Sequence, residues 1–285
     1  MKNAKSDNLL LFLLVTLGWT WYTGFLPLFF GLGDTAAGDT LFKLIAGPVP
    51  SFVALALVFA TYSKEQKRDY FRRVVSIRQM GLMWPLLTMA FFAVILGVSI
   101  FVSVFFLGGE PPGFGGVRAI ARSPHLILLY LFFALVSGPL NEEFGWRGFA
   151  LDKLFARRGF WAGSAILGFV WGIWHLPWYF YPGNGQYIFW HLSPIHGIMY
   201  IASTITLSCV ISIVYVKTNR SILSAFFVHM ISNFFTSGQL IYPFGASYMI
   251  ALLYVTIALQ ATVILCFMRS AKFRLEIEEK LAALL

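Results

Sequence analysis

The sequence predicts an all-α, polytopic integral membrane protein, and three observations support this prediction. First, 59% of its 285 residues are hydrophobic and only 12% are charged, well below the roughly 25% of charged residues in soluble domains. Second, several continuous apolar runs approach the roughly 20 residues that a helix needs to cross a bilayer. Third, these runs lack the period-two alternation of an outer-membrane barrel. We expect one membrane domain over residues 1–285, with about eight transmembrane helices around a central polar cavity.

The apolar runs and the loops between them define the spans. The first run follows the polar stretch MKNAKSDN. It is long and lacks a small-residue cleavage site, so we interpret it as a retained span rather than a signal peptide. The second span contains Lys43, which lies near its start and can extend its amine to the membrane interface. The eight predicted spans cover residues 8–30, 41–62, 82–107, 125–149, 160–181, 196–216, 221–238 and 244–268.

The lysine and arginine residues indicate how these spans are oriented. With the N-terminus inside, 17 of the 21 basic residues fall in the inner segments, and only Arg118 and Arg122 fall in the outer loops. This asymmetry follows the positive-inside rule, so we expect both termini in the cytoplasm and, in a prokaryote, a location in the cell membrane. It also accounts for the net charge of +9, so no nucleic-acid partner is needed. The inner basic residues are Lys2, Lys5, Lys64, Lys67, Arg68, Arg72, Arg73, Arg78, Lys153, Arg157, Arg158, Lys217, Arg220, Arg269, Lys272, Arg274 and Lys280.

Two further features of the sequence are interpreted without assigning chemistry to them. The inner segment YSKEQKRDYFRRVVSIRQMG is basic, with apolar and aromatic residues between the charges. It predicts an interfacial helix against anionic lipid, with a partner-docking site as the alternative. Cys209 and Cys266 both fall within spans, and we interpret them as small apolar residues rather than a disulfide or metal pair.

Ionisable residues inside the spans are the strongest functional signal, because a charge at the bilayer centre costs at least about 2.5 kcal/mol. In the fourth span, Glu143 and Arg147 are spaced i, i+4 and can pair on one helix face. Glu142 lies about 100° around the helix and projects elsewhere. It is therefore a free carboxylate suited to general acid–base chemistry. Gly138 and Pro139, just before it, loosen the backbone and leave room for water.

The fifth and seventh spans carry the polar residues that could complete such a site. His229 and Asn233 are spaced i, i+4, and together they could polarise a carbonyl group. His175 closes the stretch WGIWH, and Trp171, one turn earlier, could wall a pocket. We expect a shared cavity that opens toward the cytoplasm. The structural alternatives are an ion-pair network in the fourth span and a packing role for His175. The remaining histidines are interpreted as interfacial: His125, His191 and His196.

This ordered set of motifs resembles the CAAX prenyl protease 2 (Ras-converting enzyme) family, within the wider group of CPBP, or ABI, intramembrane proteases. The motifs are Glu142-Glu143-x-x-x-Arg147, then Trp171-x-x-x-His175, then His229-x-x-x-Asn233. They follow in order across spans four to seven, cover about a third of the chain, and fit a prokaryotic, archaeal member. One departure is Trp171, where the second motif usually has phenylalanine. We expect this change to alter the shape of the pocket rather than its chemistry.

The resemblance implies a hydrolase that removes the C-terminal tripeptide from proteins whose CAAX cysteine is prenylated. It implies that Glu142 activates the attacking water and that His175 assists. It implies that His229 and Asn233 form the oxyanion hole. Glu143 and Arg147 would support the site and contact the substrate's C-terminal carboxylate, and Trp171 would support it. The implied partners are prenylated CAAX C-termini and the lipid bilayer.

Three alternatives stay open from the sequence. Glu142, His175 and His229 could ligate zinc, as two histidines and a glutamate do in zinc proteases. No two of them have the spacing of an HExxH motif, so we favour a glutamate protease without a cofactor. The second alternative is a proton-coupled transporter, since buried ionisable residues also line such pathways, but the halves of the chain show no internal symmetry. The third is a bacteriocin-immunity protein on the same scaffold.

Overall fold

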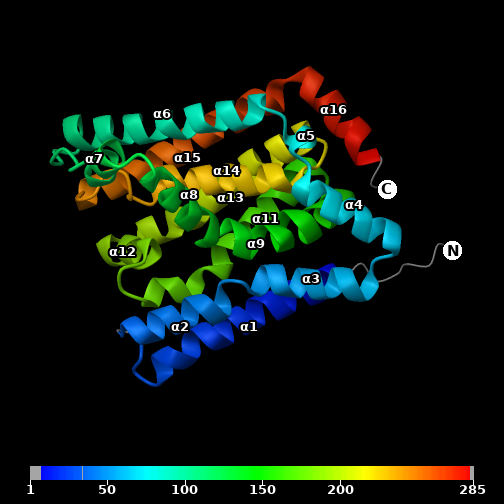
Figure 1. Ribbon diagram of the computed structural model, residues 1–285, viewed down its shortest axis with the longest axis horizontal. Helices are drawn as coiled ribbons and strands as arrows, with labels where there is room; N and C mark the ends of the chain where they lie inside the picture. Colours follow the sequence, from blue (N-terminus) through cyan, green and yellow to red (C-terminus); the bar gives the residue numbers. More distant parts are fainter. Residues whose placement is uncertain (1–7, 34, 283–285) are drawn as a thin grey trace.

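The computed structural model describes residues 8–33 and 35–282, and within these ranges every regular element is a helix (Figure 1). The predicted all-α class is therefore confirmed. The helices are α1 (Leu9–Phe29), α2 (Ala36–Ala46), α3 (Val49–Thr61), α4 (Lys64–Val75), α5 (Ile77–Met80), α6 (Met83–Phe105), α7 (Gly115–Arg122), α8 (Leu126–Val136), α9 (Pro139–Gly145), the π-turn η1 (Trp146–Ala150), α10 (Leu151–Arg158), α11 (Phe160–Trp174), the 3₁₀ turn η2 (Leu176–Phe180), α12 (Gly185–Leu192), α13 (Pro194–Lys217), α14 (Ile222–Thr236), α15 (Ala246–Arg269) and α16 (Ala271–Ala282).

Every predicted span contains a helix, and the described residues provide six helical segments long and apolar enough to cross a membrane. The chain is a multi-pass membrane protein. The predicted fifth and seventh spans fall outside these six, because α11 and α14 have only 15 residues each, about 22 Å of helix. The six segments are Leu9–Phe29, Ala36–Thr61, Met83–Phe105, Leu126–Arg158, Pro194–Lys217 and Ala246–Arg269.

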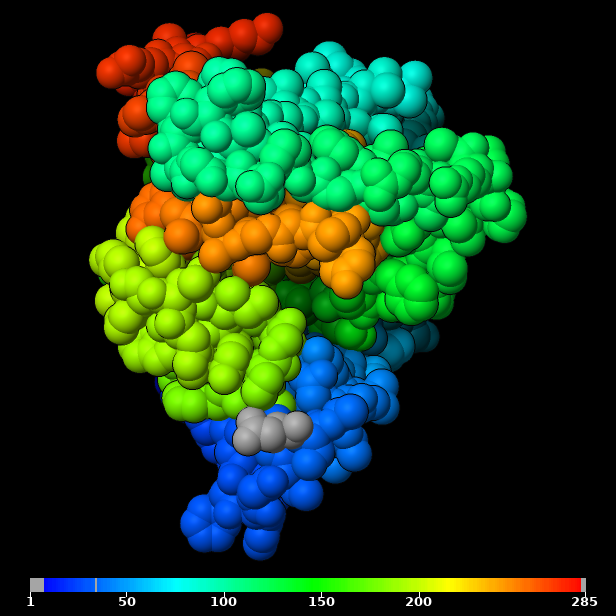
Figure 2. Space-filling model, turned by 90° about the vertical axis from the view of Figure 1, so that its left-hand side faces the viewer, coloured from blue at the N-terminus to red at the C-terminus, as the bar shows by residue number. Residues whose placement is uncertain are grey.

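The short helices lie inside the bundle rather than at its edge. α13 has the largest buried share of the six segments, and it packs against α11, α14 and α15. In Figure 1, α6 and α15 run along one edge and α1, α2 and α3 along the other, with α9 and α11 between them. The end of the bundle that carries α12 is hollowed, and Figure 2 shows this hollow between α12 in yellow-green and the start of α15 in orange. The helices that carry the candidate site residues are therefore central.

The fourth predicted span is not the single helix that we expected over residues 125–149. α8 ends at Val136, α9 begins at Pro139, and a π-turn and α10 extend the segment to Arg158. The break follows from Pro139, which lacks an N–H group and disfavours a helical conformation in the residue before it. The Asn141 side-chain amide donates to the Val136 carbonyl at 2.8 Å and so satisfies an acceptor that the break leaves free. The break interrupts the helix directly before Glu142 and Glu143, which we call the acidic pair.

The segments predicted to share the inner side meet at one end of the bundle. Arg73 on α4 donates to Asp152 on α10 at 3.3 Å and to the Tyr215 hydroxyl on α13 at 2.7 Å. Lys217, at the end of α13, pairs with Glu276 on α16. Figure 1 shows α4, α5 and α16 at this end and α7 and α12 at the opposite end. The basic segment after the second span is helical, as predicted, and its contact with lipid remains a prediction.

Candidate active site

The acidic pair is divided between two different environments. Glu143 Oε1 accepts from Arg147 Nη1 at 2.7 Å and from His229 Nδ1 at 2.8 Å. The ion pair expected from the i, i+4 spacing is therefore present, and neither of its side chains has any exposed surface. A carboxylate only accepts hydrogen bonds, so the proton on His229 is held at Nδ1, and Nε2 is the ring nitrogen left for chemistry. Glu143 thus orients His229.

Glu142 is 4% exposed and faces a different group of residues. Its Oε2 accepts from the Trp171 indole N–H at 2.5 Å. A Cβ atom placed on Gly138 would lie 3.0 Å from Glu142 Oε1, 3.1 Å from His229 Nε2 and 3.1 Å from Asn233 Nδ2. Three polar atoms from α9 and α14 therefore converge on one point, which stays open because residue 138 has no side chain. We call this point the Gly138 pocket.

Asn233 reaches the Gly138 pocket from the same face of α14 as His229. Its amide nitrogen donates to the Ala134 carbonyl near the end of α8 at 3.4 Å. An amide group has two N–H donors, so one remains available toward the pocket. The break between α8 and α9 thus provides both the open position at Gly138 and the carbonyl that holds Asn233.

His175 lies beside this group without joining it directly. Its Nδ1 donates to the Trp171 carbonyl at 2.8 Å, because a carbonyl oxygen only accepts, and Nε2 is left as an acceptor. The imidazole packs among aromatic rings, with centroids 4.7 Å from Trp174, 5.3 Å from Trp178 and 5.6 Å from Tyr200. Within the described ranges no hydrogen bond joins His175 to Glu142. A water molecule would have to connect them.

Trp171 is the central contact of the site, and it does more than we expected from the sequence. Its ring centroid lies 5.9 Å from that of His175 and 5.1 Å from that of His229, and the Arg147 guanidinium lies over it at 4.7 Å. The expectation that tryptophan in place of phenylalanine changes only the pocket shape is wrong. The indole N–H donates to Glu142, and a phenyl ring has no such donor.

The zinc alternative requires Glu142, His175 and His229 to converge on one ion. Among residues 8–33 and 35–282, no group of three or more histidine, cysteine, aspartate or glutamate side chains is placed to hold a metal ion. The Nδ1 atoms of His175 and His229 are engaged by the Trp171 carbonyl and by Glu143, so only the Nε2 atom of each ring would be left to bind a metal. The side chains as arranged do not form a zinc ligand set.

The comparison with protein families covers this part of the chain. Residues 124–235 match the family of type II CAAX prenyl endopeptidase Rce1-like proteins. This range runs from α8 into α14 and contains every residue of the site described above. This part of the chain is therefore similar to Rce1-like proteins. The chain is also similar to CAAX prenyl protease 2 of Methanococcus maripaludis, with 27% identity over 215 residues that cover 75% of this chain and 77% of that protein.

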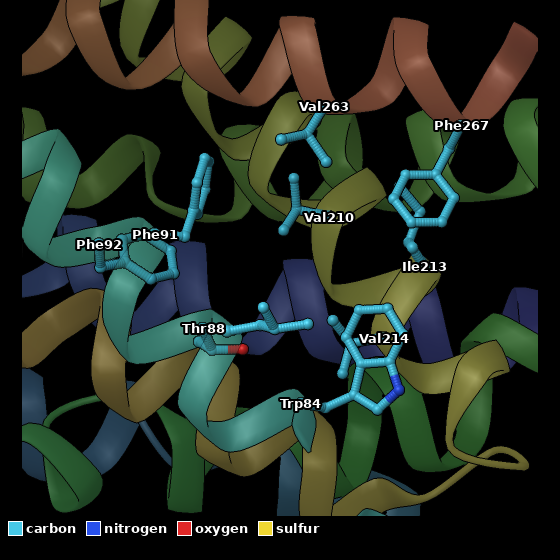
Figure 3. Close-up of a pocket in the computed structure, with 10 residues that line it drawn as sticks. Trp84, Thr88, Phe91, Phe92, Val210, Ile213, Val214, Val263 and Phe267 are labelled. Carbon is cyan, nitrogen blue, oxygen red and sulfur yellow. The ribbon is translucent and has the colours of Figure 1, made fainter.

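The structure also has an apolar pocket away from Glu142 and Glu143. Ten side chains from α6, α13 and α15 line it, and all of them except Thr88 are apolar (Figure 3). None of the candidate site residues is among them. The pocket lacks the ionisable groups that hydrolysis requires, so the Gly138 pocket is the candidate active site.

The buried Glu143–Arg147 pair makes the fold sensitive to loss of either charge. We expect Arg147→Leu to lower the free energy of unfolding by about 3–5 kcal/mol, because it leaves a buried carboxylate without its main partner. Thermal unfolding in detergent micelles would measure the loss. The matched control is the double variant Glu143→Leu/Arg147→Leu, which buries no unpaired charge and should unfold closer to the unmodified protein. An Arg147→Leu variant that unfolds at the unmodified temperature contradicts this prediction.

Proposed function

We propose that this chain is an intramembrane endopeptidase that removes the C-terminal tripeptide of prenylated CAAX proteins, using a water molecule activated by Glu142. The main support is the convergence of Glu142 Oε1, His229 Nε2 and Asn233 Nδ2 on the Gly138 pocket. A carboxylate base facing two nitrogen atoms across one open position is the arrangement that hydrolysis of a peptide carbonyl needs. The Rce1-like family and the similarity to a CAAX prenyl protease add to this support.

The two sides of the pocket have different roles in the proposed reaction: one activates water and the other stabilises the oxyanion. Glu142 takes a proton from water as the water oxygen attacks the scissile carbonyl carbon, and His175 Nε2 accepts the second hydrogen bond of that water. The carbonyl oxygen becomes negative and is stabilised by the Asn233 amide and by His229 in its doubly protonated form, in which Nδ1–H donates to Glu143 and Nε2–H donates to the oxygen. Glu142 then returns its proton to the leaving amine as the C–N bond breaks.

Glu143, Arg147 and Trp171 act in support of this reaction. Arg147 has no exposed surface and lies behind Glu143, which favours a bracing role over contact with the substrate's carboxylate. Trp171 contributes the hydrogen bond that fixes Glu142 Oε2, leaving Oε1 toward the pocket. Arg147 and Trp171 therefore act through Glu143 and Glu142 respectively, and Glu143 acts through His229.

The charge asymmetry gives the orientation that this function needs. From the positive-inside rule we infer that both termini and the α4, α5 and α16 end lie in the cytoplasm and that, in a prokaryote, the protein lies in the cell membrane. Prenylated C-termini approach from the cytoplasmic side of the bilayer with their lipid inserted. The partners are therefore prenylated CAAX termini and the bilayer, and the basic surface is used for lipid rather than nucleic acid.

A peptide assay tests the function directly. The purified protein in liposomes is incubated with a farnesylated CAAX peptide and with the same peptide lacking the farnesyl group, and the products are read by mass spectrometry. We expect loss of the three C-terminal residues from the farnesylated peptide. Intact peptides after long incubation would contradict the proposal and favour the transporter or immunity alternatives. Uptake of solutes into proteoliposomes would then identify a transporter.

Chelation tests the metal dependence of the same reaction. We expect cleavage of the farnesylated peptide to continue at an unchanged rate after treatment with EDTA and 1,10-phenanthroline, because Glu142 itself supplies the base. Metal analysis of the active protein accompanies the assay. Activity that is lost on chelation and restored by zinc would overturn the glutamate mechanism.

A further inference from the structure

A tyrosine outside the family motifs contacts the segment that carries the acidic pair. Tyr70 lies on α4 and has no exposed surface. Its hydroxyl donates to the Phe144 carbonyl at 2.7 Å, across 74 positions of sequence. This carbonyl follows Glu143 directly and stands just before the π-turn that carries Arg147. The backbone that directs both carboxylates is thus held by a side chain from another helix.

The same ring also packs against the middle of the π-turn, at Gly148. A Cβ atom on Gly148 would lie 2.8 Å from the Tyr70 hydroxyl oxygen and 3.0 Å and 3.1 Å from two of its ring carbons. The glycine therefore lets the ring approach the turn closely. One aromatic side chain touches the backbone on both sides of Arg147.

The position of Tyr70 is itself fixed. One turn further along α4, Arg73 is 5% exposed and is held by Asp152 and by the Tyr215 hydroxyl. Burial raises the pKa of the Tyr70 phenol above its ordinary value, so the hydroxyl keeps its proton and remains a donor. α4 is therefore a fixed element rather than a loosely attached surface helix.

A π-turn needs such support because its backbone departs from the regular helical bonding pattern. In η1 the Leu151 N–H donates to the Trp146 carbonyl, five residues back instead of four. Single π-turns of this kind occur often at functional sites. A donor from another helix, aimed at the carbonyl just before the turn, fixes where the turn begins.

We propose that Tyr70 is a positioning residue of the candidate active site, holding the 142–147 segment so that Glu142 and Glu143 keep their places. This rests on the proposed function. Tyr70 does not border the Gly138 pocket, so its loss changes how the carboxylates are aimed and not what the substrate touches. We therefore expect the loss of the Tyr70 hydroxyl to lower kcat and to leave KM nearly unchanged.

The first test is Tyr70→Phe, which keeps the ring and removes only the hydroxyl. We expect kcat for the farnesylated peptide to fall about tenfold, with KM changed less than twofold. The matched control is Tyr181→Phe. Tyr181 is equally buried and donates to the Gly24 carbonyl at 2.8 Å, away from the acidic segment. The control should lose similar thermal stability and keep its kcat.

A second variant changes the other partner of the Tyr70 contact, Gly148. Gly148→Ala places a methyl group against the Tyr70 hydroxyl, and we expect it to lower kcat as Tyr70→Phe does. In the Tyr70→Phe background the nearest clashing atom is gone, so adding Gly148→Ala should cost less than it does alone. Equal losses in both backgrounds would mean that the two residues act independently and would contradict the proposal.

Hydrogen exchange gives a readout that does not depend on turnover. Peptides covering residues 139–150 should exchange faster in Tyr70→Phe than in the unmodified protein or in Tyr181→Phe. If the unmodified protein leaves the farnesylated peptide intact, the proposed function fails while this measurement still tests the role of Tyr70. Unchanged exchange in Tyr70→Phe, or a kcat equal to that of Tyr181→Phe, would overturn the positioning role.

Discussion

Glu142→Gln lowers kcat/KM for a farnesylated CAAX peptide by about 10²–10⁴-fold, the range expected when a general base is removed. Glutamine has nearly the same shape, and its carbonyl oxygen can still accept from the Trp171 indole. Its amide group cannot take a proton from water at the position that Oε1 now occupies. Steady-state cleavage followed by mass spectrometry measures the loss.

The control for this variant is its stability. Because the amide fits the same buried place without a charge, we expect Glu142→Gln to unfold at a temperature close to that of the unmodified protein. A folded variant with near-normal turnover would remove Glu142 from the mechanism. Reduced turnover together with early unfolding would instead show that the carboxylate is needed for the fold.

Gly138→Ala lowers kcat/KM by about 10²-fold or more while leaving the protein folded. The added methyl group would lie 3.0–3.1 Å from Glu142 Oε1, His229 Nε2 and Asn233 Nδ2, closer than nine in ten contacts of real Cβ atoms. In the proposed mechanism it would occupy the position that water and the substrate carbonyl need. A displacement of about 1 Å in reacting groups is enough for a loss of this size. The same peptide assay measures it.

Gly97 on α6 provides the matched control for that substitution. A Cβ atom on Gly97 meets nothing within 4 Å. Gly97→Ala should therefore keep full activity and leave stability equal or slightly higher, since alanine favours helix. Gly138→Ala with the activity of Gly97→Ala would show that the Gly138 pocket is not where the chemistry occurs.

Contacts within a single helix could be predicted from the sequence. The i, i+4 spacing of Glu143 and Arg147 predicted an ion pair that the structure contains, since this spacing places two side chains on one face. Apolar runs predicted where helices form, and the charges predicted which segments share one end of the bundle. Each of these properties depends on helical periodicity or on how apolar and basic segments are distributed relative to a membrane. Both patterns are visible in the sequence itself.

Contacts between helices were decided by the tertiary structure. Glu143 meets His229 across 86 positions and Glu142 meets Trp171 across 29, and spacing gives no rule for such distances. Packing also gave Gly138 a role that the sequence indicated only as a loosened backbone. The sequence alone determined an α-helical membrane protein with a charged fourth span, its braced carboxylate and the residue types of a hydrolytic site. The packing of α9, α11 and α14 decided which carboxylate faces the open position, because only packing brings distant helices together.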